Sequence, residues 1–516
     1  MKVKYFLALI QILATCPVLL YSQSVYFNNR YDVTPFNSED WGKSLIIQDN
    51  DYIIQGETFN EYGRRSIFTM KIDSVGTLRW IKPFGNATGI YAPGKPGSLI
   101  KFGNNYYCAA NSRTYTSNWV HDRGLLIKFD SEFDTLWSKE YGESTAPYDT
   151  AYIFWNINKT TDNCLIITGL RKPYALYTKP ILIKTDSCGN IIWEQTYTNL
   201  PGYVEGWSVV QTTDGGYAIG AFSFYSIPPP NETGDPVVIK TDCEGNFQWI
   251  HNCGGDLTDT PAMVANSADG NILVLSAYSD SVSGGSDYAG KIHIVKLTND
   301  NQVLFDRMYN RRLYMMDPRS IYCNPDGSII TTGTTGTKLE DYPFTVGWLF
   351  KTTSEGDSLW YREFQKIGSP NMYAPNNLLH GIPTSDQGYI ACGYVLPQPP
   401  DTGTQDVWVV KVDSMGCESP TYCWVGVEEQ QVAPKMGELL AFPNPAKDFF
   451  RVQFQQVSQK SLLQFVDMTG RKAEETNITP FTTTEVLNCS HWPPGVYFGQ
   501  LICDGKIVAK GKVVVK

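Results

Sequence analysis

The sequence predicts an all-β fold, a seven-bladed β-propeller followed by a small C-terminal β-sandwich. Seven short apolar segments each end in a lysine, and these lysines stand 55 to 60 residues apart, at Lys71, Lys128, Lys184, Lys240, Lys296, Lys351 and Lys411. Six of them are followed nine residues later by an aromatic residue, at Trp80, Trp137, Trp193, Trp249, Phe305 and Trp360. A fixed period of this length indicates an array of one repeated supersecondary unit.

One repeat, residues 207–253, predicts four strands joined by two tight turns and one longer loop. The strands are expected at 208–211, 217–220, 237–241 and 247–250, with glycine-containing turns at 214–216 and 242–246. The middle two strands are apolar on both faces, which is typical of sheets covered on both sides. Four-stranded sheets arranged radially are propeller blades. A solenoid is the alternative, but its terminal repeats should be capped, and here they are ordinary.

The last repeat predicts how the ring closes. Its third strand, 407–412, runs into residues 417–420 without an outer strand that ends in an aromatic residue. The apolar segment 25–28 precedes the first complete repeat and can supply the missing strand. We therefore expect the N-terminus to pair with 407–412, which would remove the open edge of the ring.

The repeated lysines and tryptophans are interpreted as structural residues. A residue that recurs in every blade serves the blade, and each tryptophan is expected to pack between neighbouring blades. In five repeats an aspartate follows two residues after the lysine, as Asp242 follows Lys240. Because residues two apart share one face of a strand, a local ion pair between them is expected.

Composition and the N-terminus limit the possible locations and partners. The formal net charge is -10 and the chain has no basic run, which argues against nucleic acid as a partner. Residues 1–22 resemble a signal peptide, with a short apolar stretch after Lys2 and Lys4. No other segment of 18 apolar residues follows, so no transmembrane segment is expected in the mature chain. No metal-binding cysteine spacing occurs; the expected disulfides are Cys417–Cys423 and Cys489–Cys503.

The C-terminal part of the chain has a different pattern. The propeller is expected to span residues 23–417 and a polar linker 418–437, followed by short alternating strands in 438–516. This last segment resembles the type A C-terminal sorting domain of the type IX secretion system of Bacteroidota. The resemblance is carried by Phe442, Pro443, Asn444, Pro445, Gly470, Gly495, Tyr497 and Lys516, and by the sequence around them.

The resemblance implies export in two steps, through the inner membrane by the signal peptide and across the outer membrane by the sorting domain. It implies that the type IX machinery is a partner and that the protein is secreted or displayed on the outer-membrane surface. The sorting domain is usually cleaved during export in that family. The repeats also resemble uncharacterised propeller repeats found in such cargo, which say nothing about a ligand.

Propeller geometry predicts a binding face. The turns between strands one and two and between strands three and four share one face, whereas the longer, aromatic-rich loops share the other. Long loops on a rigid scaffold are where binding residues concentrate. A recognition module for extracellular glycan or protein is therefore expected, with candidate ligand-binding residues Tyr115, Trp119, Tyr225, Tyr314 and Tyr373.

Carboxylates gather shortly before the first strand of several repeats. Asp40, Glu205, Asp259 and Asp317 could ring the mouth of the channel and hold a hard cation such as Ca²⁺; alternatively, each could cap local backbone amides. No cofactor is otherwise expected. The chain has no nucleophile or metalloprotease motif, which favours a protein that is not an enzyme. A polysaccharide hydrolase with paired carboxylates at the propeller mouth needs no such motif and is the alternative.

Overall fold

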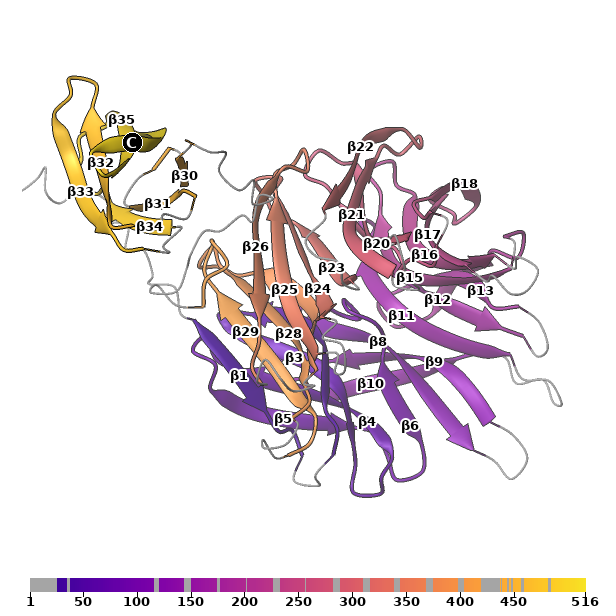
Figure 1. Ribbon diagram of the computed structural model, residues 1–516. Coiled ribbons are helices and arrows are strands. Elements are labelled where there is room, and N and C mark those ends of the chain that lie inside the picture. Colours follow the sequence, from indigo (N-terminus) through magenta and orange to yellow (C-terminus); the bar gives the residue numbers. More distant parts are fainter. Residues whose placement is uncertain are drawn as a thin grey trace, which may run out of the picture. The chain divides into compact units, whose positions relative to one another are not determined.

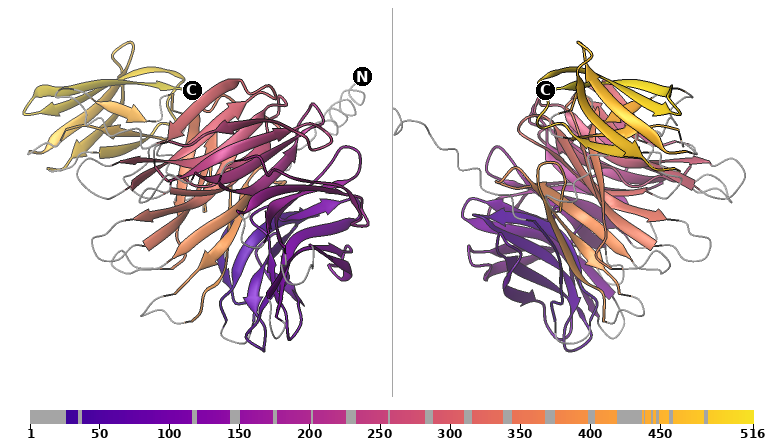
Figure 2. Two further views of the ribbon diagram at one scale, coloured as in Figure 1. Left: turned by 90° about the vertical axis from the view of Figure 1, so that its right-hand side faces the viewer. Right: turned by 60° about the vertical axis from the view of Figure 1, so that its left-hand side comes forward.

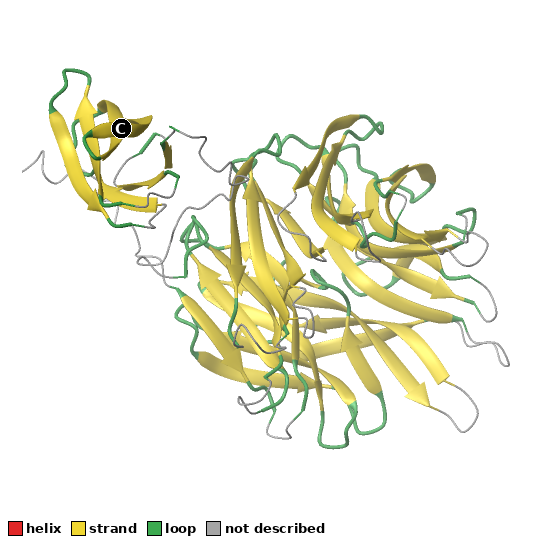
Figure 3. Cartoon of the chain, in the orientation of Figure 1, coloured by secondary structure: helices red, strands yellow, loops and turns green. Residues whose placement is uncertain are grey.

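The computed structural model describes most of the chain from Tyr26 to its C-terminus (Figure 1). The described ranges are 26–34, 38–115, 120–142, 150–173, 177–200, 202–225, 233–255, 257–281, 288–309, 316–337, 344–367, 375–397, 403–418, 437, 439–442, 445–446, 449–455, 459–480 and 484–516. Within these ranges the chain forms strands and turns and no helix (Figure 3), which confirms the all-β prediction. Consequently, the described residues contain no helix long and apolar enough to span a membrane.

The chain divides into two compact units, Met1–Cys423 and Trp424–Lys516. In the first unit the described residues form seven antiparallel sheets, which we call blades one to seven. Their strands are β2 (Trp41–Gln48), β3 (Asp51–Phe59), β4 (Arg65–Ile72), β5 (Leu78–Phe84); β6 (Ile90–Pro93), β7 (Leu99–Phe102), β8 (Asn105–Tyr115), β9 (Val120–Phe129), β10 (Thr135–Tyr141); β11 (Ala151–Lys159), β12 (Leu165–Lys172), β13 (Lys179–Thr185), β14 (Ile191–Thr196); β15 (Tyr203–Gln211), β16 (Tyr217–Tyr225), β17 (Thr233–Thr241), β18 (Phe247–Asn252); β19 (Met263–Asn266), β20 (Ile272–Ser281), β21 (Tyr288–Leu297), β22 (Val303–Tyr309); β23 (Met316–Cys323), β24 (Ile329–Thr337), β25 (Phe344–Thr352), β26 (Ser358–Phe364); and β27 (Asn376–Pro383), β28 (Tyr389–Val395), β29 (Asp406–Val412) with β1 (Phe27–Tyr31).

The blades form a closed ring. Figure 2 shows their sheets from two further sides. Each blade packs against the next one along the chain, and blade seven packs against blade one through β28 and β2. Between neighbouring blades lie clusters of fully buried aliphatic and aromatic side chains, such as Ile166, Ile219 and Ile239 between blades three and four. This is a propeller-type arrangement, and burial of apolar area between blades stabilises it.

The N-terminal strand closes the ring as expected. β1 pairs antiparallel with β29, and Phe27 lies opposite Lys411. In the other six blades the repeated lysine lies opposite the aromatic residue nine positions later, as Lys240 lies opposite Trp249. Phe27 therefore occupies the place of the aromatic residue that the last repeat lacks. The prediction for residues 27 and 28 is confirmed, and Val25 lies outside the described residues.

The lysines do not pair with the aspartate two residues later, so that prediction is wrong. Five of them instead pair with an aspartate in or beside the first turn of their own blade, at N–O distances of 2.6 to 3.0 Å: Lys71–Asp51, Lys184–Asp162, Lys240–Asp214, Lys296–Asp269 and Lys411–Asp386. The aspartate two residues after the lysine instead accepts hydrogen bonds from backbone N–H groups of its own turn. Asp242 Oδ1, for example, accepts the backbone N–H groups of Glu244 and Asn246 at 2.9 and 2.8 Å.

The second unit contains two sheets that share one core. Its strands are β30 (Leu440–Phe442), β31 (Phe449–Gln453) and β34 (Thr484–Asn488) in one sheet, and β32 (Ser461–Asp467), β33 (Lys472–Ile478), β35 (Gly495–Cys503) and β36 (Lys506–Val515) in the other. Phe450 from the first sheet and Phe465 from the second both pack against Trp492 in this core. Cys503 is a free thiol, so the expected Cys489–Cys503 disulfide is wrong. Cys417 is disulfide-bonded, and its expected partner, Cys423, lies outside the described residues.

Candidate functional site

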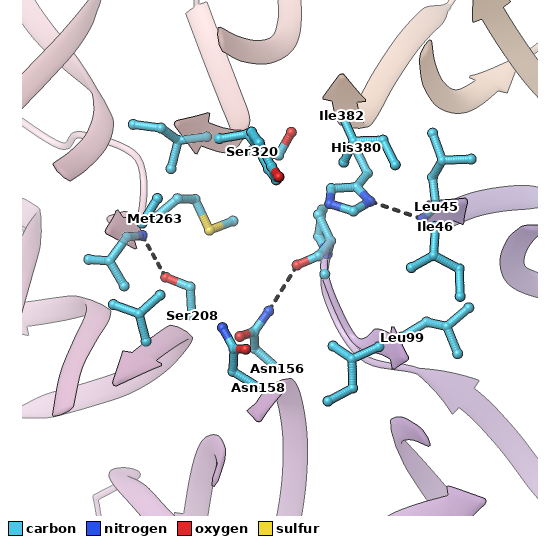
Figure 4. A pocket seen from close by; sticks show the side chains of 18 of the residues that line it. Leu45, Ile46, Leu99, Asn156, Asn158, Ser208, Met263, Ser320, His380 and Ile382 are labelled. Atoms are coloured by element: carbon cyan, nitrogen blue, oxygen red, sulfur yellow. Dashed lines mark hydrogen bonds between the residues drawn. The ribbon is translucent and has the colours of Figure 1, made fainter. Parts of the chain in front are cut away.

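The innermost strands of the seven blades surround a central channel of about 610 Å³ (Figure 4). Every blade contributes lining residues, because the first strand of each repeat is the one nearest the axis. Leu45, Leu99 and Met263 make much of the wall apolar, whereas Asn156 and His380 place polar atoms along it (Figure 4). The channel is a cavity of the size that small ligands occupy.

A β-bulge recurs in five of the innermost strands and re-aims one residue in each. The pairing skips Lys43, Trp155, Trp207, Arg319 and Leu379. Bulges are frequent beside functional sites because they redirect a side chain without ending the strand. Each bulge lies in the first half or at the midpoint of its strand, and in blades three, four and seven the channel lining begins at the residue after the bulge, namely Asn156, Ser208 and His380. The skipped residues therefore lie toward the end of the channel where the longer loops are.

The residue after each bulge ties its blade to the next. Each of these five side chains accepts a backbone N–H of the following blade at 2.9 to 3.1 Å, the acceptors being Ser44, Asn156, Ser208, Ser320 and His380. At the ring closure His380 Nδ1 accepts the N–H of Leu45, so its other nitrogen carries the proton in the neutral ring (Figure 4). Burial lowers the pKa of His380 to about 4, which keeps it a neutral acceptor.

Lys95 lies at the loop-side end of the channel. It belongs to the segment between β6 and β7, whose backbone is held by the bond from Lys95 N to Trp155 O at 2.7 Å. Its ammonium nitrogen is 4.8 Å from the ring centroid of Trp155 and 4.2 Å from that of Trp207. These two rings contact each other edge to face at 5.0 Å. The arrangement is a cation–π contact with two indole rings.

Three carboxylates accompany this lysine. Glu57 pairs with Lys43 at 2.7 Å, and Asp317 pairs with Arg319. Glu205 interacts electrostatically with Lys95. We call the set Lys43, Glu57, Lys95, Trp155, Glu205, Trp207, Asp317 and Arg319 the mouth cluster.

Partial burial shifts the ionisation of the mouth cluster. Burial raises the pKa of Glu205 and of Asp317, although Lys95 opposes the shift in both. Burial also lowers the pKa of Lys95 to about 8, and repulsion from Lys43 and Arg319 adds to this effect. Alternating charges beside two indole rings can hold a polar ligand that also presents an apolar face.

The structure divides the four carboxylates that the sequence placed in one ring. Glu205 and Asp317 join the mouth cluster, whereas Asp40 and Asp259 lie away from it. Asp259 accepts the backbone N–H groups of Gly255 and Ser279 at 2.9 and 2.6 Å, and Asp40 accepts that of Val33 at 2.9 Å. Asp259 caps the loop between blades four and five, which is the alternative role expected for such an aspartate.

Of the predicted ligand-binding aromatics, the described residues include the side chain of Tyr115. It is half exposed, and the Arg64 guanidinium lies 5.8 Å from its ring. Tyr225 ends β16, but its side chain lies outside the described part of the structure. Trp119, Tyr314 and Tyr373 lie wholly outside the described residues. Their role stays a prediction.

Four further exposed aromatics lie on the same loop face, namely Tyr62, Tyr177, Tyr203 and Phe224. Tyr177 and Tyr203 come from different loops and meet edge to face with ring centroids 4.7 Å apart. The criterion that selected Tyr115, an aromatic residue in a long loop, would have found Tyr62 and Tyr177 as well. No sequence signal could have found Lys95, Trp155 and Trp207 as neighbours, because the bulges and the ring bring them together.

In the second unit, sorting-motif residues surround a hollow of about 510 Å³. It is lined by the Asp467 turn and by the segment that contains Gly495 and Tyr497. Gly470 has φ +85° and closes that turn, in which Asp467 Oδ1 accepts the N–H of Arg471 at 2.9 Å. The last residue, Lys516, donates its N–H to Ala446 O at 2.9 Å. Phe442 ends β30, Pro445 is exposed, and Pro443 and Asn444 lie outside the described residues.

Comparison with known proteins identifies the C-terminal segment. Residues 440–516 match the family described as secretion system C-terminal sorting domain. The chain is therefore a type IX secretion cargo that is secreted or displayed at the cell surface. No curated protein matches this sequence.

Several solved structures are similar to the chain at 12% identity or less. A fungal alcohol oxidase of the AA5 family in complex with copper has 12% identity and a TM-score of 0.40, covering 96% of this chain and 99% of that one. The β-propeller domain of the trilobed protease from Pyrococcus furiosus has 11% identity and a TM-score of 0.37, covering 72% and 93%. A GH43 endo-arabinanase from Bacillus licheniformis has 12% identity and a TM-score of 0.30, covering 53% and 100%. At such scores these likenesses say nothing about activity.

Proposed function

We propose that this protein is an extracellular recognition module that binds glycan or protein through the loop face of its propeller. The observation that carries the proposal is the gathering of exposed aromatic side chains on that face, Tyr62, Tyr115, Tyr177, Tyr203 and Phe224. Tyrosines supply a large contact area at low entropic cost, and sugars stack on their rings. The sorting domain delivers the propeller to a place where such ligands occur.

The experiment is a glycan array together with a pull-down from extracellular material, using the purified exported protein. A variant with Tyr115, Tyr177 and Tyr203 replaced by alanine is expected to lose at least tenfold in affinity, about 1.4 kcal/mol or more. The matched control replaces Leu136, Ile192 and Phe247, which are similarly exposed on outer strands, and should bind normally. Unchanged binding by the tyrosine variant would move the site off this face.

A polysaccharide hydrolase is the second candidate, favoured by Glu205 and Asp317 in the mouth cluster. Glycosidases need one carboxyl group that stays protonated near neutral pH, and burial raises the pKa of both of these groups. Polysaccharides that bind on the array should be tested for release of reducing ends. Turnover that Glu205→Gln abolishes while binding persists would replace the recognition module with the hydrolase.

A further inference from the structure

Three carboxylates converge where the N-terminal strand joins the ring. Asp32 follows β1, Asp40 precedes β2, and Asp406 begins β29. One oxygen atom from each lies within 4.8 Å of the other two. Within the described ranges, this is the one group of three or more aspartate, glutamate, histidine or cysteine side chains placed closely enough to hold a metal ion.

The negative charge of this cluster is incompletely compensated. Asp40 is fully buried and Asp406 is 2% exposed, whereas Asp32 is exposed. Asp406 Oδ2 accepts a hydrogen bond from Arg30 Nε, but its buried Oδ1 has no hydrogen-bond partner. Arg30 thus offsets one of three charges. A buried carboxylate oxygen without a partner is costly, and Asp406 belongs to a group of three carboxylates with oxygens within 4.8 Å of one another, an arrangement that a cation would satisfy.

A second pair of aspartates, Asp235 and Asp259, allows a comparison with the cluster of three carboxylates. Asp40 N donates to Gln405 O, the residue before Asp406, at 2.8 Å. In the same way Asp259 N donates to Gly234 O, the residue before Asp235, at 2.8 Å. Asp259 and Asp235 therefore occupy, at blades four and five, the positions that Asp40 and Asp406 occupy at the ring closure. Both oxygens of Asp259 accept backbone N–H groups, and Asp235 accepts Asn252 Nδ2 at 3.1 Å. This pair has no third carboxylate among the described residues.

We propose that Asp32, Asp40 and Asp406 bind one calcium ion. Ca²⁺ prefers carboxylate and carbonyl oxygens, accepts six to eight ligands in irregular geometry, and leaves room for water at the exposed Asp32. Extracellular calcium modules work with dissociation constants of about 10⁻⁴ to 10⁻³ M, which suits a protein that is exported. The ion would connect the N-terminal strand, blade one and blade seven, and would therefore stabilise the closed ring.

The test is calcium titration of the full exported protein after treatment with EDTA, followed by calorimetry and by thermal unfolding. One Ca²⁺ per chain is expected to bind with a dissociation constant on the order of 10⁻⁴ M and to raise the melting temperature of the propeller. Asp32→Asn should weaken binding at least tenfold, and Asp406→Asn likewise. Because Asp32 is exposed, its variant is expected to fold normally.

Asp235→Asn is the matched control and should leave calcium affinity unchanged. Absence of both binding heat and a thermal shift in the natural protein would overturn the proposal. The same holds if Asp32→Asn binds calcium as tightly as the natural protein, or if Asp235→Asn weakens binding as much as Asp406→Asn does.

Discussion

Lys240 illustrates the structural role of the repeated lysine at the scale of a single residue. Its side chain is fully buried, and Nζ donates to Asp214 at 2.7 Å and to Thr241 O at 2.8 Å. Asp214, by contrast, keeps 40% of its side chain exposed. Removing the Asp214 carboxylate therefore leaves a buried ammonium group without a counter-ion, whereas removing Lys240 leaves a carboxylate that water can reach.

We predict that Asp214→Asn destabilises the propeller by about 3 kcal/mol, because it leaves the buried Lys240 ammonium without its counter-ion. Lys240→Met should cost clearly less, since water can solvate the remaining carboxylate. Urea unfolding, followed by tryptophan fluorescence, measures both. Asp357→Asn, which breaks the exposed pair with Arg307 within the propeller, is the control and should cost under about 1 kcal/mol. A larger loss for Lys240→Met than for Asp214→Asn would contradict this account.

At the scale of an element, the N-terminal strand is the outer strand of blade seven. β1 pairs with β29 along five consecutive positions, and Phe27 and Tyr31 enter the buried core between blades seven and one. Tyr31 Oη also donates to Gly76 O of blade one at 2.7 Å. One short strand thus covers the open edge of the last blade and holds the first blade against it.

Deletion of residues 24–30 is therefore expected to lower the melting temperature of the whole propeller. The strand's backbone bonds and the buried Phe27 side chain are both lost, and a buried Phe→Ala change alone costs about 3–5 kcal/mol. Phe305→Ala, which removes the equivalent aromatic from a continuous blade, is the control with the smaller expected loss. Differential scanning calorimetry compares them, and an unchanged melting temperature after the deletion would show that closure does not depend on β1.

At the scale of the whole molecule, the chain consists of two compact units, of which the first is the one proposed for recognition and the second carries the sorting domain. The first unit contains the channel, the mouth cluster and the exposed aromatics, and residues 440–516 of the second match the sorting-domain family. The signal peptide at 1–22, the propeller bounds 23–417, the linker at 418–437 and the sorting domain at 438–516 remain proposed boundaries.

Removal of residues 438–516 is expected to leave the propeller in the periplasm of a host with a type IX system, because the sorting domain is the export address. Cell fractionation with immunoblotting measures this, with the full-length protein as the control. Normal surface display or secretion of the truncated protein would contradict it. Mass spectrometry of the secreted form should also find that the sorting domain has been removed.

The sequence by itself determined the blades, because six of the seven are local hairpin arrays in which the lysine and the aromatic residue nine positions later face each other. It also indicated that residues near 25–28 complete blade seven, since the missing aromatic residue was visible in the last repeat. The positions of the candidate site residues could not be predicted from the sequence in this way. Glu205, Asp259 and their counterparts look alike in sequence, yet one enters the mouth cluster and the other caps a loop.

Only the tertiary structure decided which residues meet across blades. Lys95, Trp155 and Trp207 come from three different repeats, and they meet because bulges redirect the indole rings toward a common axis. Asp32 and Asp406 are far apart along the chain and become neighbours when β1 closes the ring. The repeat period carries information about contacts within a blade, whereas contacts across the axis and across the closure depend on the position of every blade at once.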